Sequence, residues 1–411
     1  EELGPSAGLT VRSALKWIRD DVQEVIEAAD RYDLDKDEKM KLLDSNGFLA
    51  VDGAIQTLKA EHRNSRLRVD EEGAPLHALR FARDGKTVRN LQVVISDPVT
   101  GAVQAIDSFK LTQQDIDYFT QYPGNFAALD LLANNRRSDP MHQYRELRIR
   151  LDADGRPEYA VVFSLSGTFV EALYKFIKDP ITGRLEALDN YWLTTADRTA
   201  MQTNIDNFTA LDGIAAGVTF ANRVSRIRVD AVGNAGYSLN FAADGTDVEG
   251  LTKFVLDPET GIVALADHYA LIDAQKVVLT ANIDVFPTLD GIVQFQTDLP
   301  VPLRVLLKQR MMRVRLKDTF QPLYSVVYAD DGTTVEGFNR FIIPTNDYWV
   351  RAVDSYELTP SLKGQLQGQV DAIDGTPPGA VSGLDGAAAN VPLEQRRKRV
   401  RIDLEWKQLY A

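Results

Sequence analysis

Four short landmarks recur in register along this chain, and their constant spacing constrains the fold more than any other feature. Each copy opens with an Arg-x-Arg pair, and a glycine follows nineteen residues after the first Arg. A proline in a DPxTG pentapeptide and an Asp at offset 41 complete the set. The Arg-x-Arg onsets begin at Arg66, Arg148, Arg226 and Arg313, and a fifth begins at Arg399.

The block between the first Arg and the last Asp keeps its length while the distance between blocks varies. The glycines are Gly85, Gly167, Gly245 and Gly332. The prolines are Pro98, Pro180 and Pro258, with Pro344 in the degraded fourth copy, IPTND. Successive onsets are 82, 78 and 87 residues apart. Hydrogen-bonded strands resist insertions that surface connections tolerate, so the block is predicted to be a sheet.

Within the block, apolar and polar residues alternate in LHALRFA, GYSLNFA and LYSVVYA, which is typical of strands with one buried face. The glycine that follows indicates a tight turn, because glycine adopts positive φ without a Cβ clash. DPxTG is predicted to close the next hairpin. A segment such as LTTADRTAMQTNIDNFTALDG (193–213) is predicted to be one short helix that ends at its Asp-Gly turn.

The expected fold class is therefore α+β, with four tandem repeats of about 80 residues, each a short helix plus a four-stranded antiparallel meander. The repeats are placed at 34–112, 113–194, 195–272 and 273–359. Residues 1–33 are expected to form an amphipathic N-terminal helix. Residues 360–394 are expected to hold a helix remnant and a Gly/Ala/Pro linker, before a C-terminal strand over 395–411 that starts an incomplete fifth unit.

The N-terminal helix is expected because apolar residues follow a near-heptad spacing between residues 10 and 29. They are Val11, Leu15, Ile18, Val22, Val25 and Ala29. Such a seam suggests self-association as a dimer or trimer, and the alternative is a helix docked on the first repeat.

The repeated Arg and Asp residues form a second candidate site. The set is Arg66, Arg68, Asp107, Arg148, Arg150, Asp189, Arg226, Arg228, Asp267, Arg313, Arg315 and Asp354. Both Arg side chains of a pair lie on one face of the strand. A cross-strand salt bridge to the Asp, or to Glu171, Glu249 or Glu336, is favoured over a ladder of phosphate or glycan sites.

Composition and motifs argue against an enzyme and against a cofactor. The chain has no cysteine, and its four histidines (His62, His77, His142, His268) lack a metal-ligand spacing. A calcium loop at 33–44, with Asp33, Asp35 and Asp37, lacks the expected glycine. No apolar run is long enough for a membrane span. A net charge of −13 disfavours nucleic acid, so the basic run QRRKRVR (395–401) is assigned to protein contact or edge protection.

Tandem modules with DPxTG-type hairpin turns behind an N-terminal helix resemble, in style, virion structural proteins of tailed bacteriophages. That resemblance implies a fibre, collar, baseplate or decoration protein, located in the virion, with itself and other virion proteins as partners. The alternative is a bacterial surface adhesin or carbohydrate-binding repeat protein, extracellular or on the cell surface. There a host glycan would stack on Tyr191, Trp192, Tyr269, Tyr348 and Trp349.

Overall fold

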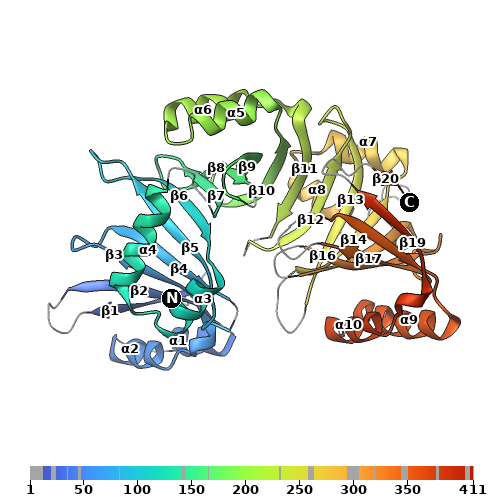
Figure 1. The fold of residues 1–411 in the computed structure, drawn as a ribbon, viewed down its shortest axis with the longest axis horizontal. Helices are drawn as coiled ribbons and strands as arrows, with labels where there is room; N and C mark the ends of the chain where they lie inside the picture. The colour runs from blue at the N-terminus through green and yellow to red at the C-terminus, as the bar shows by residue number, and fades with distance from the viewer. Residues whose placement is uncertain are drawn as a thin grey trace, which may run out of the picture. The chain divides into compact units, whose positions relative to one another are not determined.

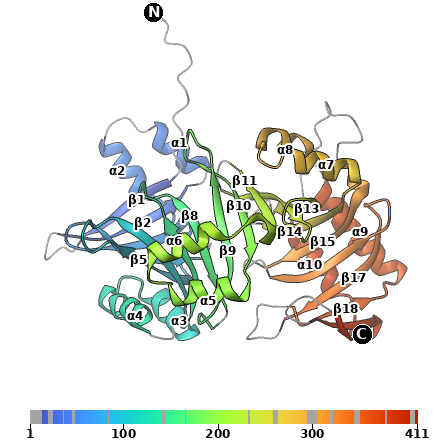
Figure 2. The ribbon, with the colours of Figure 1, turned by 90° about the horizontal axis from the view of Figure 1, so that it is seen from above.

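The computed structural model describes residues 13–19, 25–34, 36–44, 48–82, 84–139, 144–164, 166–230, 233–257, 263–293, 305–317, 321–343, 350–375, 379–402 and 408–410. The chain divides into two compact units. Unit 1 is Glu1–Ala172 with Arg198–Thr203, and unit 2 is Leu173–Asp197 with Asn204–Ala411. Figures 1 and 2 show the elements from two sides.

Unit 1 is built on an antiparallel meander in which each strand pairs with the next along the chain. Its strands are β1 (Ser13–Arg19), β2 (Ile26–Asp33), β3 (Arg63–Val69), β4 (Pro75–Phe81), β5 (Val88–Ser96), β6 (Val103–Lys110), β7 (Arg145–Leu151) and β8 (Pro157–Phe163). Strand β9 (Val170–Lys178) contains the boundary between the units.

Unit 2 continues in the same style, from β10 to β20, again with antiparallel pairing of consecutive strands. These strands are β10 (Leu185–Trp192), β11 (Arg223–Val229), β12 (Ala235–Phe241), β13 (Val248–Leu256), β14 (Val263–Ala270), β15 (Arg310–Leu316), β16 (Pro322–Tyr328), β17 (Val335–Ile342), β18 (Ala352–Tyr356), β19 (Arg396–Ile402) and β20 (Gln408–Tyr410).

Helices come in pairs between every fourth strand and the next one. The pairs are α1 (Lys36–Asp44) with α2 (Phe48–Gln56), α3 (Gln113–Gln121) with α4 (Phe126–Ser138), α5 (Thr195–Thr203) with α6 (Phe208–Gly217), α7 (Asp273–Ala281) with α8 (Phe286–Val293), and α9 (Pro360–Asp374) with α10 (Val381–Ala389). Short 3₁₀ turns η1 (Ala60–His62), η2 (Phe220–Asn222), η4 (Leu307–Gln309) and η5 (Leu393–Gln395) lead into the following strands.

The α3–α4, α7–α8 and α9–α10 pairs each form a hydrophobic core with strands of the sheet. In one core, Leu251 and Tyr269 from the strands cluster with Leu279 and Leu289 from α7 and α8. A polar side chain of the first helix also accepts a hydrogen bond from the backbone N–H that begins a strand. The four bonds join residues 32 apart, as Val88–Thr120, Val170–Gln202, Val248–Thr280 and Val335–Gln367.

The expectation of four separate helix-plus-meander repeats is wrong, because strands of neighbouring repeats are hydrogen-bonded to each other. The β6–β7, β10–β11, β14–β15 and β18–β19 pairs all cross the expected repeat boundaries. The physical reason is that the last strand of a meander has an edge of unpaired N–H and C=O groups, which the next strand satisfies.

The expectation of one helix per repeat is also wrong. In two repeats the segment breaks into two helices at an Asn whose side chain caps the second helix: Asn125 accepts from the Ala128 N–H at 3.2 Å, and Asn207 accepts from that of Ala210. The Asp-Gly pair at Asp212 lies inside α6 and ends no helix.

The N-terminal segment that was expected to be an amphipathic helix is a β-hairpin, so the heptad argument is wrong. Strand β1 pairs with β2 from Ser13↔Asp33 to Arg19↔Ile26. The 4-3 spacing put Leu15 and Ile18 on one helical face, but in a strand they lie on opposite faces, and Leu15 is 50% exposed. Val25 precedes β2 and Ala29 is buried within it, whereas Val11 and Val22 lie outside the described residues.

The stretch expected to be a linker instead holds α10, which packs against α9 and the sheet (Figure 1). Its Val381, Leu384 and Ala388 are buried with Leu366 of α9 and Phe338 of β17. The Gly and Ala residues that suggested a linker are small, so they allow this helix to approach its neighbours closely. Leu and Val at helical spacing supply its apolar face.

Two turn predictions agree with the local geometry. In DPVTG and DPITG the first Asp accepts hydrogen bonds from the next N–H groups, and Gly101 and Gly183 have φ of 72° and 67°. At Gly245 a Cβ would lie 1.7 Å from the carbonyl oxygen of Phe220 in η2, so this glycine meets both a positive φ and a close backbone approach.

Candidate functional site

The repeated Arg and Asp residues meet at the junctions between repeats. The offset-41 Asp contacts the Arg of the following repeat, which lies opposite it on the next strand. At the β6–β7 junction, Arg148 donates from Nε and Nη2 to Asp107, at 2.6 and 2.7 Å. The other forked pairs are Arg226–Asp189, Arg313–Asp267, Arg399–Asp354 and Arg66–Asp30.

A second Arg, three residues before the first, was not recognised from the sequence. Arg310 donates from Nε to the Gly332 carbonyl at 3.0 Å, stacks 4.1 Å from the Tyr328 ring centroid, and lies 3.4 Å from Asp267. Arg63 and Arg223 make the same three contacts with their own glycine, Phe and Asp. The signal available was R-x-x-R-x-R, which occurs at all five onsets.

The last Arg of that motif connects the strand to the second helix of the pair. Arg315 donates to Asp385 of α10 at 2.9 Å and to the Ala264 carbonyl on the neighbouring strand. The Tyr324 hydroxyl donates to the same Asp385 at 2.6 Å. Equivalent contacts join Arg228 to Asp290 and Arg68 to Asp130, while Arg150 donates to the Gln104 carbonyl.

The junction clusters at β6–β7, β10–β11 and β14–β15 are closed electrostatic units. Arg310 and Arg313 are among the largest fully buried side chains, and Asp267 is 3% exposed. Burial and the neighbouring Asp189 raise the pKa of Tyr191 to about 12. Because guanidinium groups stay charged and their fork is occupied by protein carboxylates, the clusters hold strands together and present no open anion site.

A third cation faces the offset-41 Asp from the strand on its other side. Lys253 lies opposite Asp267 in the β13–β14 register and donates to the Val293 carbonyl at the end of α8, at 2.8 Å. Lys175 does the same for Val218, and Arg340 for Ala388 and Val391. Burial lowers the pKa of Lys253 to about 8, although Asp267 opposes this shift.

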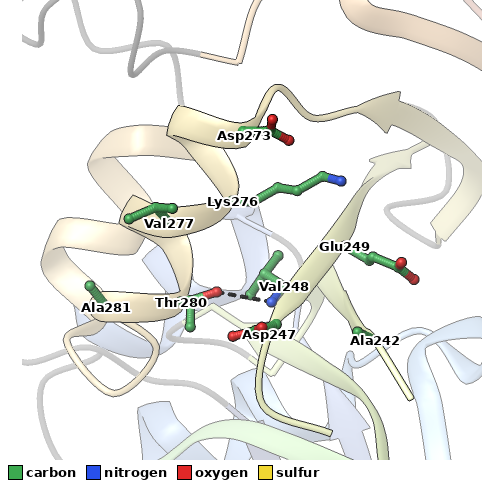
Figure 3. A pocket seen from close by; sticks show the side chains of 9 residues that line it. All are labelled: Ala242, Asp247, Val248, Glu249, Asp273, Lys276, Val277, Thr280 and Ala281. Atoms are coloured by element: carbon green, nitrogen blue, oxygen red, sulfur yellow. Dashed lines mark hydrogen bonds between the residues drawn. The ribbon is translucent and has the colours of Figure 1, made fainter. Parts of the chain in front are cut away.

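An open groove of about 620 Å³ lies between the start of β13 and α7 (Figure 3). Val248, Ala242 and Ala281 contribute apolar side chains, and the Val248 N–H donates to Thr280 Oγ1 at 2.9 Å. Its charged residues are Asp247, Glu249, Asp273 and Lys276. Figure 3 shows Lys276 extending from the helix toward the strand that carries Glu249.

The remaining sequence candidates do not assemble into a site in the described structure. Tyr191 and Tyr269 are buried and Trp192 is 50% exposed, while Tyr348 and Trp349 lie outside the described residues. Asp33 ends β2, Asp37 is in α1 and Asp35 is not described. No group of three His, Asp or Glu side chains in the described ranges could hold a metal ion.

The basic run lies at η5 and the start of β19. Arg396 and Arg399 contact Asp354, and Arg397 contacts Glu357 at 2.8 Å. None of the helices among the residues described is long and apolar enough to cross a membrane.

Comparisons with known proteins give only distant likenesses. No family model matches the sequence, and no curated protein matches it. A pore structure of the Photorhabdus luminescens Tc holotoxin is 11% identical, with a TM-score of 0.19, over 82% of this chain and 15% of the toxin chain. A TcdB2–TccC3–Cdc42 crystal structure is 9% identical, with a TM-score of 0.16, over 81% of this chain and 15% of that one.

A porin-like protein from Bacteroides uniformis is 8% identical, with a TM-score of 0.14, over 62% of this chain and 82% of its own. The chain thus spans about a seventh of the toxin chains that it matches. Scores this low assign neither a fold nor a function.

Proposed function

We propose that this chain is a non-enzymatic assembly protein of a phage virion, a fibre, collar, baseplate or decoration component whose tandem modules dock on other subunits. The observation that carries this proposal is the Asp–Arg–Arg cluster, which recurs at consecutive junctions with the same forked geometry. Repetition of the same ion-pair cluster along a meander provides stiffness and regular spacing, the properties that a scaffold requires.

The distribution of polar groups supports a scaffold over a catalyst. Buried Arg, Asp and Tyr groups of the junctions contact each other, and the same contacts occur in several repeats. A catalytic centre needs one repeat to hold reactive groups that the others lack, with space for a substrate beside them. The Arg and Asp side chains of the buried junction clusters instead contact each other and neighbouring protein groups.

The second candidate function is carbohydrate binding by a bacterial surface adhesin. It is favoured by aromatic side chains at one end of the unit 2 strands, where Trp192 is 50% exposed and Phe220 is 59% exposed. Aromatic rings can stack on the apolar face of a sugar. Against it, Tyr191 and Tyr269 are 2% and 4% exposed and belong to the core.

The experiment is density-gradient fractionation of a lysate from the source organism, followed by immunoblotting with an antibody against this chain. A virion component migrates with intact phage particles and stays with them in 1 M salt. Recovery from the cell envelope alone, with none in the particle fraction, would overturn the virion proposal and favour the adhesin. A glycan array with Trp192→Ala as the control variant then tests the second function.

A further inference from the structure

The groove beside α7 and the β9–β10 turn have complementary surfaces. We propose that the groove of one copy receives the 179–183 turn of a second copy of this chain, so that copies associate head to tail. This inference deepens the proposed function, because it names a docking surface and its partner. It rests on the chemistry of two places in unit 2 that the Arg/Asp clusters do not use.

The groove combines an apolar wall with an excess of carboxylates. Val277 of α7 lies on its wall and is 67% exposed. Three carboxylates, Asp247, Glu249 and Asp273, surround one amine, Lys276. Among the described residues no ion pair joins these four side chains to each other or to a neighbour. The groove therefore favours a ligand that presents an apolar group flanked by cations.

The β9–β10 turn presents such a group in a rigid form. Ile181 is 92% exposed at its tip. Asp179 accepts hydrogen bonds from the N–H groups of Ile181 and Thr182, at 2.9 and 2.7 Å, and its carbonyl accepts from Gly183 at 2.8 Å. A turn that is already ordered loses little conformational entropy on docking. Lys178, the last residue of β9, and Arg184, the residue before β10, flank it; the Arg184 side chain is 43% exposed and lies 3.9 Å from Glu186.

The position of the two surfaces fixes the type of association. The groove lies where β13 begins, and the turn lies where β9 ends; both strands are odd-numbered members of an antiparallel meander and run in the same direction. The surfaces are therefore at opposite ends of the strands. Two different surfaces at opposite ends give a heterologous contact that can continue from copy to copy.

The chain contains a matched control turn. DPVTG at 97–101 has the same hydrogen bonds, and its Val99 is 90% exposed. It is flanked by Ser96 and Ala102 in place of Lys178 and Arg184. The apolar tip is thus shared by both turns, and the flanking cations are present only at the β9–β10 turn.

The test uses the absence of cysteine from the chain. Two single variants, Ile181→Cys and Val277→Cys, are mixed and treated with a short bis-maleimide, and the product is resolved by denaturing electrophoresis and peptide mass spectrometry. We expect a dimer linked through residues 181 and 277, at least about tenfold more abundant than with Val99→Cys in place of Ile181→Cys, which corresponds to about 1.4 kcal/mol of added contact energy. Equal yields from the two turns would overturn the proposal.

Charge exchange separates self-docking from capture of a foreign basic peptide. In the cysteine background, Lys178→Glu with Arg184→Glu should abolish the 181–277 dimer, and Glu249→Lys with Asp273→Lys in the partner variant should restore it. Loss without restoration would mean that the groove does not recognise this turn. A double-cysteine chain that links only within itself would also overturn the proposal.

Failure of this test can be told apart from failure of the proposed function. A chain that migrates with virions but gives no 181–277 dimer keeps its virion assignment and docks by another surface. A chain that forms the dimer but is absent from virions keeps the self-docking and loses the virion assignment.

Discussion

Two junctions in unit 2 contain the same ionic cluster in different surroundings. At β14–β15, Asp267 contacts Arg310 and Arg313, whose side chains are 1% and 2% exposed. At β18–β19, Asp354 makes the same forked contact, but the Arg396 and Arg399 side chains are 39% and 47% exposed.

The difference follows from the helix that covers the first junction. Asp374 at the end of α9 contacts both Arg310 and Arg313, at 2.9 and 2.7 Å, so two carboxylates there balance two guanidinium groups. In the described part of the chain no second carboxylate contacts Arg396 or Arg399. The same motif therefore contributes a different free energy of unfolding at each junction, since burial decides how strongly an unbalanced charge destabilises the fold.

The largest expected effect comes from removing the buried carboxylate. Asp267→Ala leaves Arg310 and Arg313 with one partner in a closed site, and we expect a loss of about 3–5 kcal/mol. Asp354→Ala should cost less, about 1–2 kcal/mol, because Asp354 is buried but its Arg partners reach solvent when it is removed. Hydrogen exchange of the β14–β15 and β18–β19 peptides measures the two local losses separately. Equal losses would show that burial of the arginines does not decide the energy.

The cation opposite each Asp gives a pH-dependent comparison. Lys253 faces Asp267, and Arg340 faces Asp354. The folded pKa of Lys253 is about 8, below its ordinary value of 10.5, so between these values the unfolded chain binds more protons and stability rises with pH. From pH 8 to 9.5 the gain is about 1.6 kcal/mol at a full slope of 1.36 kcal/mol per unit, because Lys253 is already half deprotonated in the folded chain at pH 8.

Lys253→Arg is the matched variant, since it keeps the charge and, like Arg340, does not titrate in this range. Urea unfolding followed at pH 8 and 9.5 should show the gain in the natural chain and lose it in the variant. A variant with the same rise would assign the pH dependence to other groups.

The sequence predicted the repeated block, its strands and its turns because constant spacing reflects hydrogen-bonded backbone. It did not predict that Asp107 would contact Arg148 of the next repeat. Aligning the repeats with one another shows equivalent positions, but it does not show which strand edges pair. Asp30 was missed because the first hairpin lacks an Arg-x-Arg onset. The near-heptad spacing of Leu15 and Ile18 fitted a helix locally, and pairing of β1 with β2 overrode that preference.

A smaller effect is expected at the glycine that supports the buried junction. Gly332 has φ of 67°, and a Cβ there would lie 2.1 Å from the Leu307 carbonyl oxygen in η4. Gly332→Ala should destabilise unit 2 by about 2 kcal/mol from the φ preference and the displaced turn. Gly364→Ala in α9, where a Cβ meets no atom within 4 Å, should be neutral or stabilising by up to about 1 kcal/mol. Chemical denaturation of the two variants gives both values, and a harmless Gly332→Ala would show that η4 moves freely.

The smallest expected effect comes from a substitution that gives the buried junction one carboxylate, like the exposed junction. Asp374→Asn keeps an oxygen acceptor for Arg310 and Arg313 but removes the second negative charge, and we expect a loss of about 1 kcal/mol at neutral pH. Burial alone would raise the pKa of Asp374, but Arg313 and Arg310 lower it below its ordinary value of 3.8. Its contribution is therefore present above pH 3.8 and is lost as the pH falls through the folded pKa. The difference in unfolding free energy between the natural chain and the variant should therefore shrink below pH 4. Urea unfolding measures it, with Asp371→Asn, an exposed position on the same helix, as the control. A difference that stays constant with pH would assign the loss to packing and leave charge balance without a role.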